Sequence, residues 1–144
     1  MGEGAIGMPR SIVPLLLGCL WLTAASPALA QTLMVRPDLW PDSGSPQSPF
    51  CKRNQGNLVV TVKSVGPATA PLAPFYVKVE FKPGGPFEKQ VDRVIPGSTA
   101  DVQFAIPPGC FNPDCKFTIT IDSRNNIRES DKSNNVANGR CPRS

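Results

Sequence analysis

The sequence contains no histidine among its 144 residues. This absence excludes Ser-His and Cys-His catalysis as well as histidine-ligated metals. A glycine-rich phosphate loop is also missing, because Gly84-Gly85 lies between prolines and no helical pattern follows it. Paired carboxylates can hydrolyse sugars, but we expect the carboxylates here to lie on solvent-exposed faces and turns, with ordinary pKa values. We therefore expect no enzyme activity and no cofactor.

Aromatic residues and net charge are scarce as well. Aromatic side chains make up 7% of the sequence, and only Trp40 and Tyr76 offer large polar-tipped rings after Ala30. A sugar-stacking platform needs several rings on one face, so we expect Trp40 to hold the N-terminal segment against the domain and Tyr76 to cover a sheet face. The formal net charge of +4 is mild and does not indicate nucleic-acid binding.

The only long apolar run lies near the N-terminus. Arg10 precedes an apolar stretch over residues 11–25, and Ala28-Leu29-Ala30 follows it. This layout is typical of a secretory signal, and the run is too short to span a bilayer. We expect residues 1–30 to be a signal peptide cleaved after Ala30, which makes the protein periplasmic or secreted, with no transmembrane helix in the mature chain. The alternative is cleavage before Cys19, within Leu16-Leu17-Gly18-Cys19, which would leave a lipid-anchored protein.

Four cysteines follow the expected signal peptide: Cys51, Cys110, Cys115 and Cys141. An even count in a small exported chain indicates two disulfides, for which the sequence allows three pairings. Because Cys110 and Cys115 bracket a turn-forming Phe-Asn-Pro-Asp segment, we favour their pairing, which leaves Cys51 for Cys141. A zinc site is the alternative, and the absence of histidine and of a Cys-x-x-Cys pair disfavours it.

Alternation of apolar and polar residues predicts several short strands. It is clear over residues 58–63, 75–82, 101–106 and 116–122, and weaker over 87–94 and 135–141. Turn-forming proline and glycine separate these runs, and no segment after Ala30 predicts a long helix. We expect an N-terminal arm over residues 31–49, in which residues 37–41 could dock as an edge strand, and one domain over 50–144. The expected core comprises Leu58, Val60, Val62, Phe75, Val77, Val79, Phe81, Val102, Phe104, Ile106, Phe117, Ile119 and Ile121.

This pattern predicts an all-β protein, with two packed antiparallel sheets as its architecture and a partly open barrel as the alternative.

The sequence also contains an ordered series of motifs. Pro-Asp-Leu at residues 37–39 is followed by Val-Thr-Val-Lys-Ser-Val-Gly-Pro-Ala-Thr-Ala over 60–70 and by Ile-Pro-Gly-Ser over 95–98. The most specific segment is Ile-Asp-Ser-Arg-Asn-Asn-Ile-Arg-Glu-Ser-Asp-Lys-Ser-Asn-Asn over 121–135. The order of these motifs resembles the CARDB domain, a cell-adhesion-related module of bacteria, over residues 37–136. The resemblance implies an Ig-like antiparallel β-sandwich of about seven strands that serves as an adhesion or spacer module. The chain departs from the family pattern at Ser64, where asparagine is common, at Lys132, where an acidic residue is common, and in its cysteines.

Two groups of residues are candidate binding sites. Asp122, Asn125, Glu129 and Asp131 offer hard oxygen ligands for calcium. We favour a structured connection instead, in which Ile127 fills the core and nearby basic residues cancel the negative charge. The expected Cys51–Cys141 bridge would gather four cations at one end, where they could contact an anionic partner or form a solvated rim. These cations are Lys52, Arg53, Arg140 and Arg143.

The sequence therefore favours an exported binding module without catalytic activity, using a sheet face or an exposed edge. Its expected partner is another envelope or extracellular protein. The alternative is a surface glycan or another anionic surface polymer.

Overall fold

The computed structural model describes residues 36–67 and 71–143. The expected signal peptide, both of its cleavage sites and Cys19 lie outside the described residues. Within the described part of the chain, no helix is long and apolar enough to cross a membrane.

The alternating segments form the predicted strands. β3 (Asn57–Val65), β4 (Phe75–Lys82), β6 (Thr99–Ala105) and β7 (Cys115–Ile121) cover the four clear runs. β5 (Gly85–Val91) and β8 (Val136–Cys141) form at the two weaker ones, with β5 ending before residues 92–94 of the predicted strand. In β4 every second side chain is buried, as a strand with one face toward a core requires. The described residues contain one helix, the three-residue 3-10 helix η1 (Ser133–Asn135).

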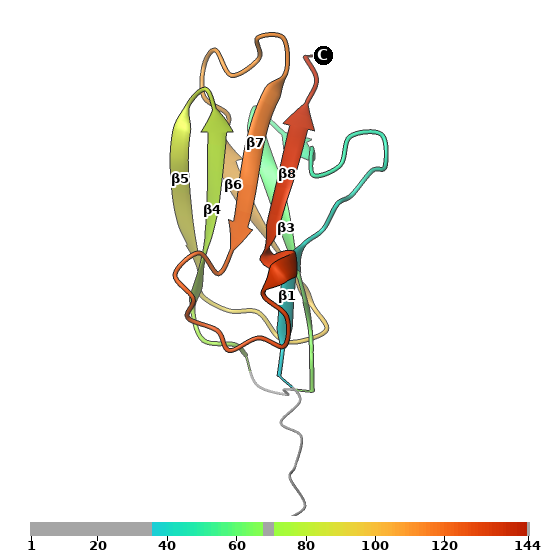
Figure 1. Ribbon diagram of the computed structural model, residues 1–144, viewed down its shortest axis with the longest axis vertical. Helices are drawn as coiled ribbons and strands as arrows, with labels where there is room; N and C mark the ends of the chain where they lie inside the picture. The colour runs from blue at the N-terminus through green and yellow to red at the C-terminus, as the bar shows by residue number, and fades with distance from the viewer. Residues whose placement is uncertain (1–35, 68–70, 144) are drawn as a thin grey trace, which may run out of the picture. The chain divides into compact units, whose positions relative to one another are not determined.

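The strands form two antiparallel sheets of four strands each. One sheet has the order β5-β4-β7-β8. In the other, β6 lies on one side of β3, while β1 (Asp38–Pro41) and β2 (Arg53–Asn54) pair with opposite ends of β3 on its other side. Figure 1 shows β5, β4, β7 and β8 side by side in front of β3 and β6. The architecture is the predicted all-β sandwich.

The core lies between the two sheets and contains nearly all the residues that alternation predicts. Ile106 is an exception, because it follows the end of β6 and is only partly buried at the edge of the core. Val59 is a second correction: its alternation with Val60 predicted a solvent-exposed side chain, yet only 5% of it is exposed. Its backbone N–H donates to the carbonyl of Lys52 at 2.7 Å, which brings the chain before β2 alongside β3 at this residue.

β1 lies within the stretch that we expected to be an arm, and it is part of the sandwich. It pairs antiparallel with residues 62–65 of β3. Leu39 is fully buried, whereas Trp40 is half-buried. Strand alternation turns Leu39 into the core and Trp40 to the other face, so the buried anchor of this strand is Leu39, and a holding role for Trp40 stays a prediction.

Two disulfides close the end of the sandwich at which β8 finishes. They join Cys51 to Cys141 and Cys110 to Cys115, in the pairing that the sequence favours. The first connects the chain just before β2 to the last residue of β8, across a sequence separation of 90 residues. Constraining so long a loop in the unfolded chain contributes about 4 kcal/mol to stability.

Candidate functional site

The connection between β7 and β8 contains two buried carboxylates that share one lysine. The Asp122 and Glu129 side chains are both 0% exposed. Lys132 Nζ lies 2.8 Å from Asp122 Oδ2 and 2.8 Å from Glu129 Oε1. We call Asp122, Glu129 and Lys132 the carboxylate–lysine cluster. Its third member is partly exposed, with 39% of the side chain open to solvent.

Backbone and amide donors satisfy the remaining oxygens of the carboxylate–lysine cluster. Asp122 accepts from the N–H of Asn126 at 2.8 Å and from that of Ile127 at 3.0 Å. Glu129 accepts from the N–H of Leu39 at 3.0 Å and from Asn135 Nδ2 at 2.8 Å. Ionised carboxylates with several donors each are stable in a protein interior.

The environment of the cluster changes the pKa values of two of its members. Burial raises the pKa of Glu129, against the opposing effect of hydrogen bonds from Lys132 and Asn135. Burial disfavours the charge on Lys132, but hydrogen bonds to Asp122 and Glu129 outweigh it and raise its pKa. The sequence-based expectation that all carboxylates lie in solvent is therefore wrong for Asp122 and Glu129. Asp122 is within reach of loop N–H groups that no strand partner uses, and Glu129 is within reach of the N–H of Leu39 in β1.

The cluster and its neighbours fasten β1 to the β7–β8 connection. Besides the Leu39–Glu129 bond, the N–H of Ser130 donates to the carbonyl of Pro37 at 2.9 Å. Asp38 accepts from the N–H of Asp131 at 3.2 Å and from Asn134 Nδ2 at 2.8 Å. Segments 90 or more residues apart in sequence are thus held together, which gives this connection a structural role.

The four candidate calcium ligands have separate contacts. Asp122 and Glu129 face Lys132, while Asp131 accepts from the N–H and the hydroxyl of Ser133. Asn125 is exposed, with a positive φ of 58° and its N–H donating to the carbonyl of Asp122. Among the described residues, no group of three or more His, Cys, Asp or Glu side chains could hold a metal ion. Ile127 is buried in the core, as predicted.

The four cations of the candidate anionic-partner patch divide among different contacts. Lys52 pairs with Asp101 at 2.8 Å across the face of the β3–β6 sheet. Arg140 lies 3.5 Å from Asp114. Arg53 stacks over the ring of Phe111, and Arg143 donates to the Phe111 carbonyl at 2.7 Å.

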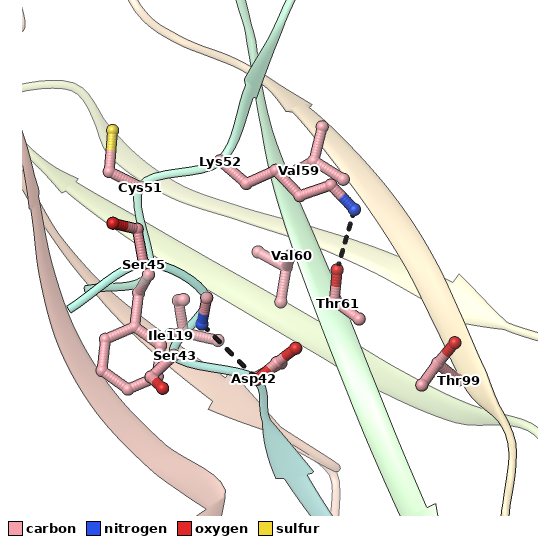
Figure 2. Close-up of a pocket in the computed structure, with 12 residues that line it drawn as sticks. Asp42, Ser43, Ser45, Cys51, Lys52, Val59, Val60, Thr61, Thr99 and Ile119 are labelled. Atoms are coloured by element: carbon pink, nitrogen blue, oxygen red, sulfur yellow. Dashed lines mark hydrogen bonds between the residues drawn. The ribbon is translucent and has the colours of Figure 1, made fainter. Parts of the chain in front are cut away.

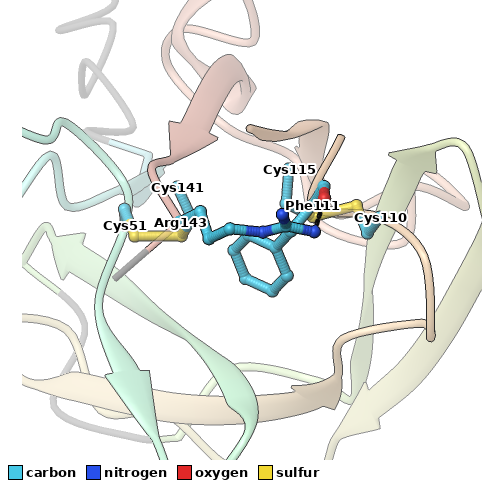
Figure 3. Close-up of a disulfide and its surroundings, with 6 residues drawn as sticks. All are labelled: Cys51, Cys110, Phe111, Cys115, Cys141 and Arg143. Atoms are coloured by element: carbon cyan, nitrogen blue, oxygen red, sulfur yellow. Dashed lines mark hydrogen bonds between the residues drawn. A yellow bond between two sulfur atoms is a disulfide. The ribbon is translucent and has the colours of Figure 1, made fainter. Parts of the chain in front are cut away.

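Figure 3 shows Arg143 extending between the two disulfides to reach Phe111. Arg53 and Arg143 therefore share one aromatic residue of the small disulfide loop, whereas Lys52 points to another face. Sequence proximity to Cys51 and Cys141 could not show which of the four cations lie on the same face, because the side-chain directions depend on strand register.

A cavity of about 250 Å³ lies beneath the segment that leads from β1 to β2. Its walls combine the polar residues Asp42, Ser43 and Ser45 with the core residues Val60 and Ile119. Figure 2 shows Lys52 reaching across to Thr61 at its rim, where the hydrogen bond measures 3.2 Å. Lys52 also donates a hydrogen bond to Asp101, which lowers the pKa of that carboxyl.

A second, shallower groove of about 330 Å³ runs over the outer face of β4, β7 and β8. Lys82, Lys116 and Arg140 line it, together with the backbone around Gly139. Of these cations, the sequence analysis singled out only Arg140. Alternation placed Lys82 and Lys116 on outer faces, but no sequence signal put them at one level of the sheet.

Tyr76 has one ring face covered. The guanidinium of Arg124 lies 3.7 Å from its centroid, and its hydroxyl donates to Gln90 at 2.7 Å. Arg124 also pairs with Glu88 at 2.6 Å, and this contact lowers the pKa of Glu88. Tyr76 thus covers a sheet face, as predicted.

The comparisons with known proteins give a family and a fold. The model of the CARDB family matches residues 36–139. The CARDB domain of a Pyrococcus furiosus protein, solved in complex with di-metal ions, superposes with a TM-score of 0.54 at 18% identity. A second structure superposes with a TM-score of 0.58 at 17% identity. It is a domain of a Methanosarcina acetivorans protein that is inferred to lie at the cell surface. Each of these two alignments covers 76% of this chain and 93% of the other. No curated protein matches the sequence.

Proposed function

The chain belongs to the CARDB family, and we propose that its sandwich is a non-catalytic interaction module that contacts another protein of the cell envelope or exterior. Two observations support a place outside the cytoplasm. The two disulfides are of a kind that persists in oxidising compartments. The Methanosarcina domain, which has the same fold, belongs to a protein that is inferred to lie at the cell surface.

The edge strand β5 is the observation that carries the proposed binding role. Among the described strands it pairs only with β4, and its residues from Gly85 to Gln90 are all exposed. An unpaired edge presents a row of N–H and C=O groups to which an extended segment of a partner can add as a further strand.

An exposed aromatic residue adds a side-chain contact to this edge. Phe87 is 42% exposed, and its ring packs edge-on against that of the buried Phe81, with centroids 5.9 Å apart. Partial burial fixes the position of the ring while leaving much of its surface free. A rigid aromatic beside a free strand edge offers a partner both main-chain pairing and an apolar anchor.

The proposal is tested by affinity capture from envelope extract with two matched variants. Phe87→Lys places a charge on the β5 edge, which disfavours strand addition. Val136→Lys makes the same type of change at an apolar residue of the other edge strand of this sheet, β8, where Val136 is 54% exposed. We expect one or more proteins to be retained by the wild-type chain and by Val136→Lys, and to be lost with Phe87→Lys.

Two outcomes would contradict the proposal. Retention of the same proteins by both variants would remove β5 as the contact edge. Failure of the wild-type chain to retain any protein, although correctly oxidised, would contradict the protein-binding role itself. The mass of the mature chain, isolated from each cell fraction, tests the expected export and cleavage after Ala30.

A further inference from the structure

We propose that the β5 edge selects a partner segment with an acidic side chain opposite Lys89 and an apolar one opposite Phe87. This inference rests on the proposed function and goes further, because it names the chemistry of the partner strand. β5 is the outer strand of its sheet (Figure 1). The side chains and backbone groups that it presents there decide which strand can be added.

Lys89 and Phe87 both turn toward the inner face of the sheet. Register places Phe87 opposite Val79 and Lys89 opposite Val77, and both valines are fully buried. The Lys89 ammonium lies 5.8 Å from the ring centroid of Phe104, a buried residue of the other sheet. Lys89 is nevertheless exposed, so its charge lies in solvent beside the β5 edge.

Lys89 is the charge of β5 that lacks an opposite charge. Glu88, on the outer face, accepts hydrogen bonds from Arg124 and from the hydroxyl of Ser123, both at 2.6 Å. Among the described residues, Lys89 forms no ion pair. Opposite charges directly across neighbouring strands stabilise a sheet, so an acidic residue of an added strand is favoured opposite Lys89.

The backbone direction at the free edge determines how such a strand would pair. Tyr76, directly opposite Gln90, accepts at its carbonyl from the N–H of Ser123 at 3.0 Å, on the side of β4 away from β5. Alternation along the antiparallel ladder therefore directs the N–H and C=O of Gln90 and Glu88 to the free edge. The inward-facing residues of β5 then fall at the intervening positions, where opposed Cα atoms are only about 4.5 Å apart and side chains are closest. An antiparallel partner thus has the order acidic, any residue, apolar along its sequence.

A second copy of the chain fits this edge poorly. A two-fold axis would pair β5 with itself around one central residue. A centre at Glu88 or Lys89 sets two like charges directly opposite each other, which is destabilising. A centre at Phe87 places Glu88 opposite Pro86, which has no N–H to donate, so each such pair loses a hydrogen bond. The edge therefore favours a different chain over its own copy.

The test measures the binding of dye-labelled peptides to the purified, oxidised protein by fluorescence anisotropy. One peptide is Thr-Thr-Glu-Thr-Val-Thr-Thr, and the other has lysine in place of glutamate. We expect the wild-type protein to bind the glutamate peptide at least about fivefold more tightly. Lys89→Glu should reverse this order, and Lys89→Gln should abolish the preference.

Lys116→Glu is the matched control. It makes the same change of charge at an exposed residue on the outer face of β7, and it should keep the wild-type order of affinities. Circular dichroism checks that each variant is folded.

Three results would overturn the inference. Loss of the preference in Lys116→Glu as well would show that net charge alone explains it. A wild-type protein that binds neither peptide, or both equally, has no acidic selectivity at this edge. A dimer in sedimentation that Phe87→Lys abolishes would show that a second copy occupies the edge. The capture experiment with Phe87→Lys tests the proposed function separately, so failure of peptide selectivity alone leaves β5 as a contact edge for a partner of other chemistry.

Discussion

Replacing Lys132 with methionine would leave two buried carboxylates without their shared cation. Methionine keeps a long apolar stem and removes the charge, so the substitution isolates the ion pairs from packing. Removing one partner of a buried ion pair costs about 3–5 kcal/mol, and exposed pairs contribute about 1 kcal/mol or less. Both carboxylates are 0% exposed, but the lysine side chain is 39% exposed, which places this case between the two limits.

The remaining hydrogen bonds limit the loss further. Asp122 keeps two backbone N–H donors, and Glu129 keeps the Leu39 N–H and the Asn135 amide. We therefore expect Lys132→Met to lower the free energy of unfolding by about 2–3 kcal/mol, or the melting temperature by roughly 10 °C. Urea denaturation with unchanged m-value measures the difference.

The loss should depend on pH with a definite sign. Burial already raises the pKa of Glu129 above its ordinary value of 4.5, and removal of Lys132 raises it further. The folded variant then holds a proton at pH values where the unfolded chain has released it. Stability of the variant relative to the wild-type protein consequently falls as the pH rises from the folded-state pKa of Glu129 in the wild-type protein to the higher one in the variant, both above 4.5, and recovers on acidification below them.

Two further variants make this reasoning refutable. Lys63→Met removes an ion pair to Asp42 in which both side chains are partly exposed, and it should cost less than about 1 kcal/mol. Adding Glu129→Gln to Lys132→Met removes one unpaired charge and should restore part of the lost stability. The account is refuted if Lys132→Met is no more destabilising than Lys63→Met, or if its deficit grows on acidification.

Three other substitutions test the packing of the sandwich. Replacing Cys51 and Cys141 together with serine should cost about 4 kcal/mol in urea denaturation, because the unfolded chain regains the freedom of a long loop; a loss under about 1 kcal/mol would contradict this. Gly139→Ala should cost about 1–3 kcal/mol, since the new methyl group overlaps the Phe117 ring, and an unchanged melting temperature would argue against that contact. Ser64→Ala should be neutral or stabilising by about 1 kcal/mol, because the buried Ser64 hydroxyl has no hydrogen-bond partner among the described residues; marked destabilisation would show that the hydroxyl has one.

The sequence alone was sufficient to predict the sandwich, because the local alternation of apolar and polar residues determines both which segments form strands and which side chains are buried. Phe75, Val77 and Val79 alternate with polar neighbours, and this period of two directs every second side chain to one face. Local chemistry also favoured the disulfide pairing, since a short turn between Cys110 and Cys115 left one choice for the other two cysteines.

Only the tertiary structure decided which distant residues meet. The burial of Asp122 and Glu129 depends on a loop that returns over β1, and alternation within one segment carries no information about such a return. The groove over β4, β7 and β8 gathers its three cations through strand register, because a shift of one residue between strands would turn Lys116 away from Lys82 and Arg140. Local sequence thus determined the strands and their faces, whereas pairing between strands determined the candidate sites.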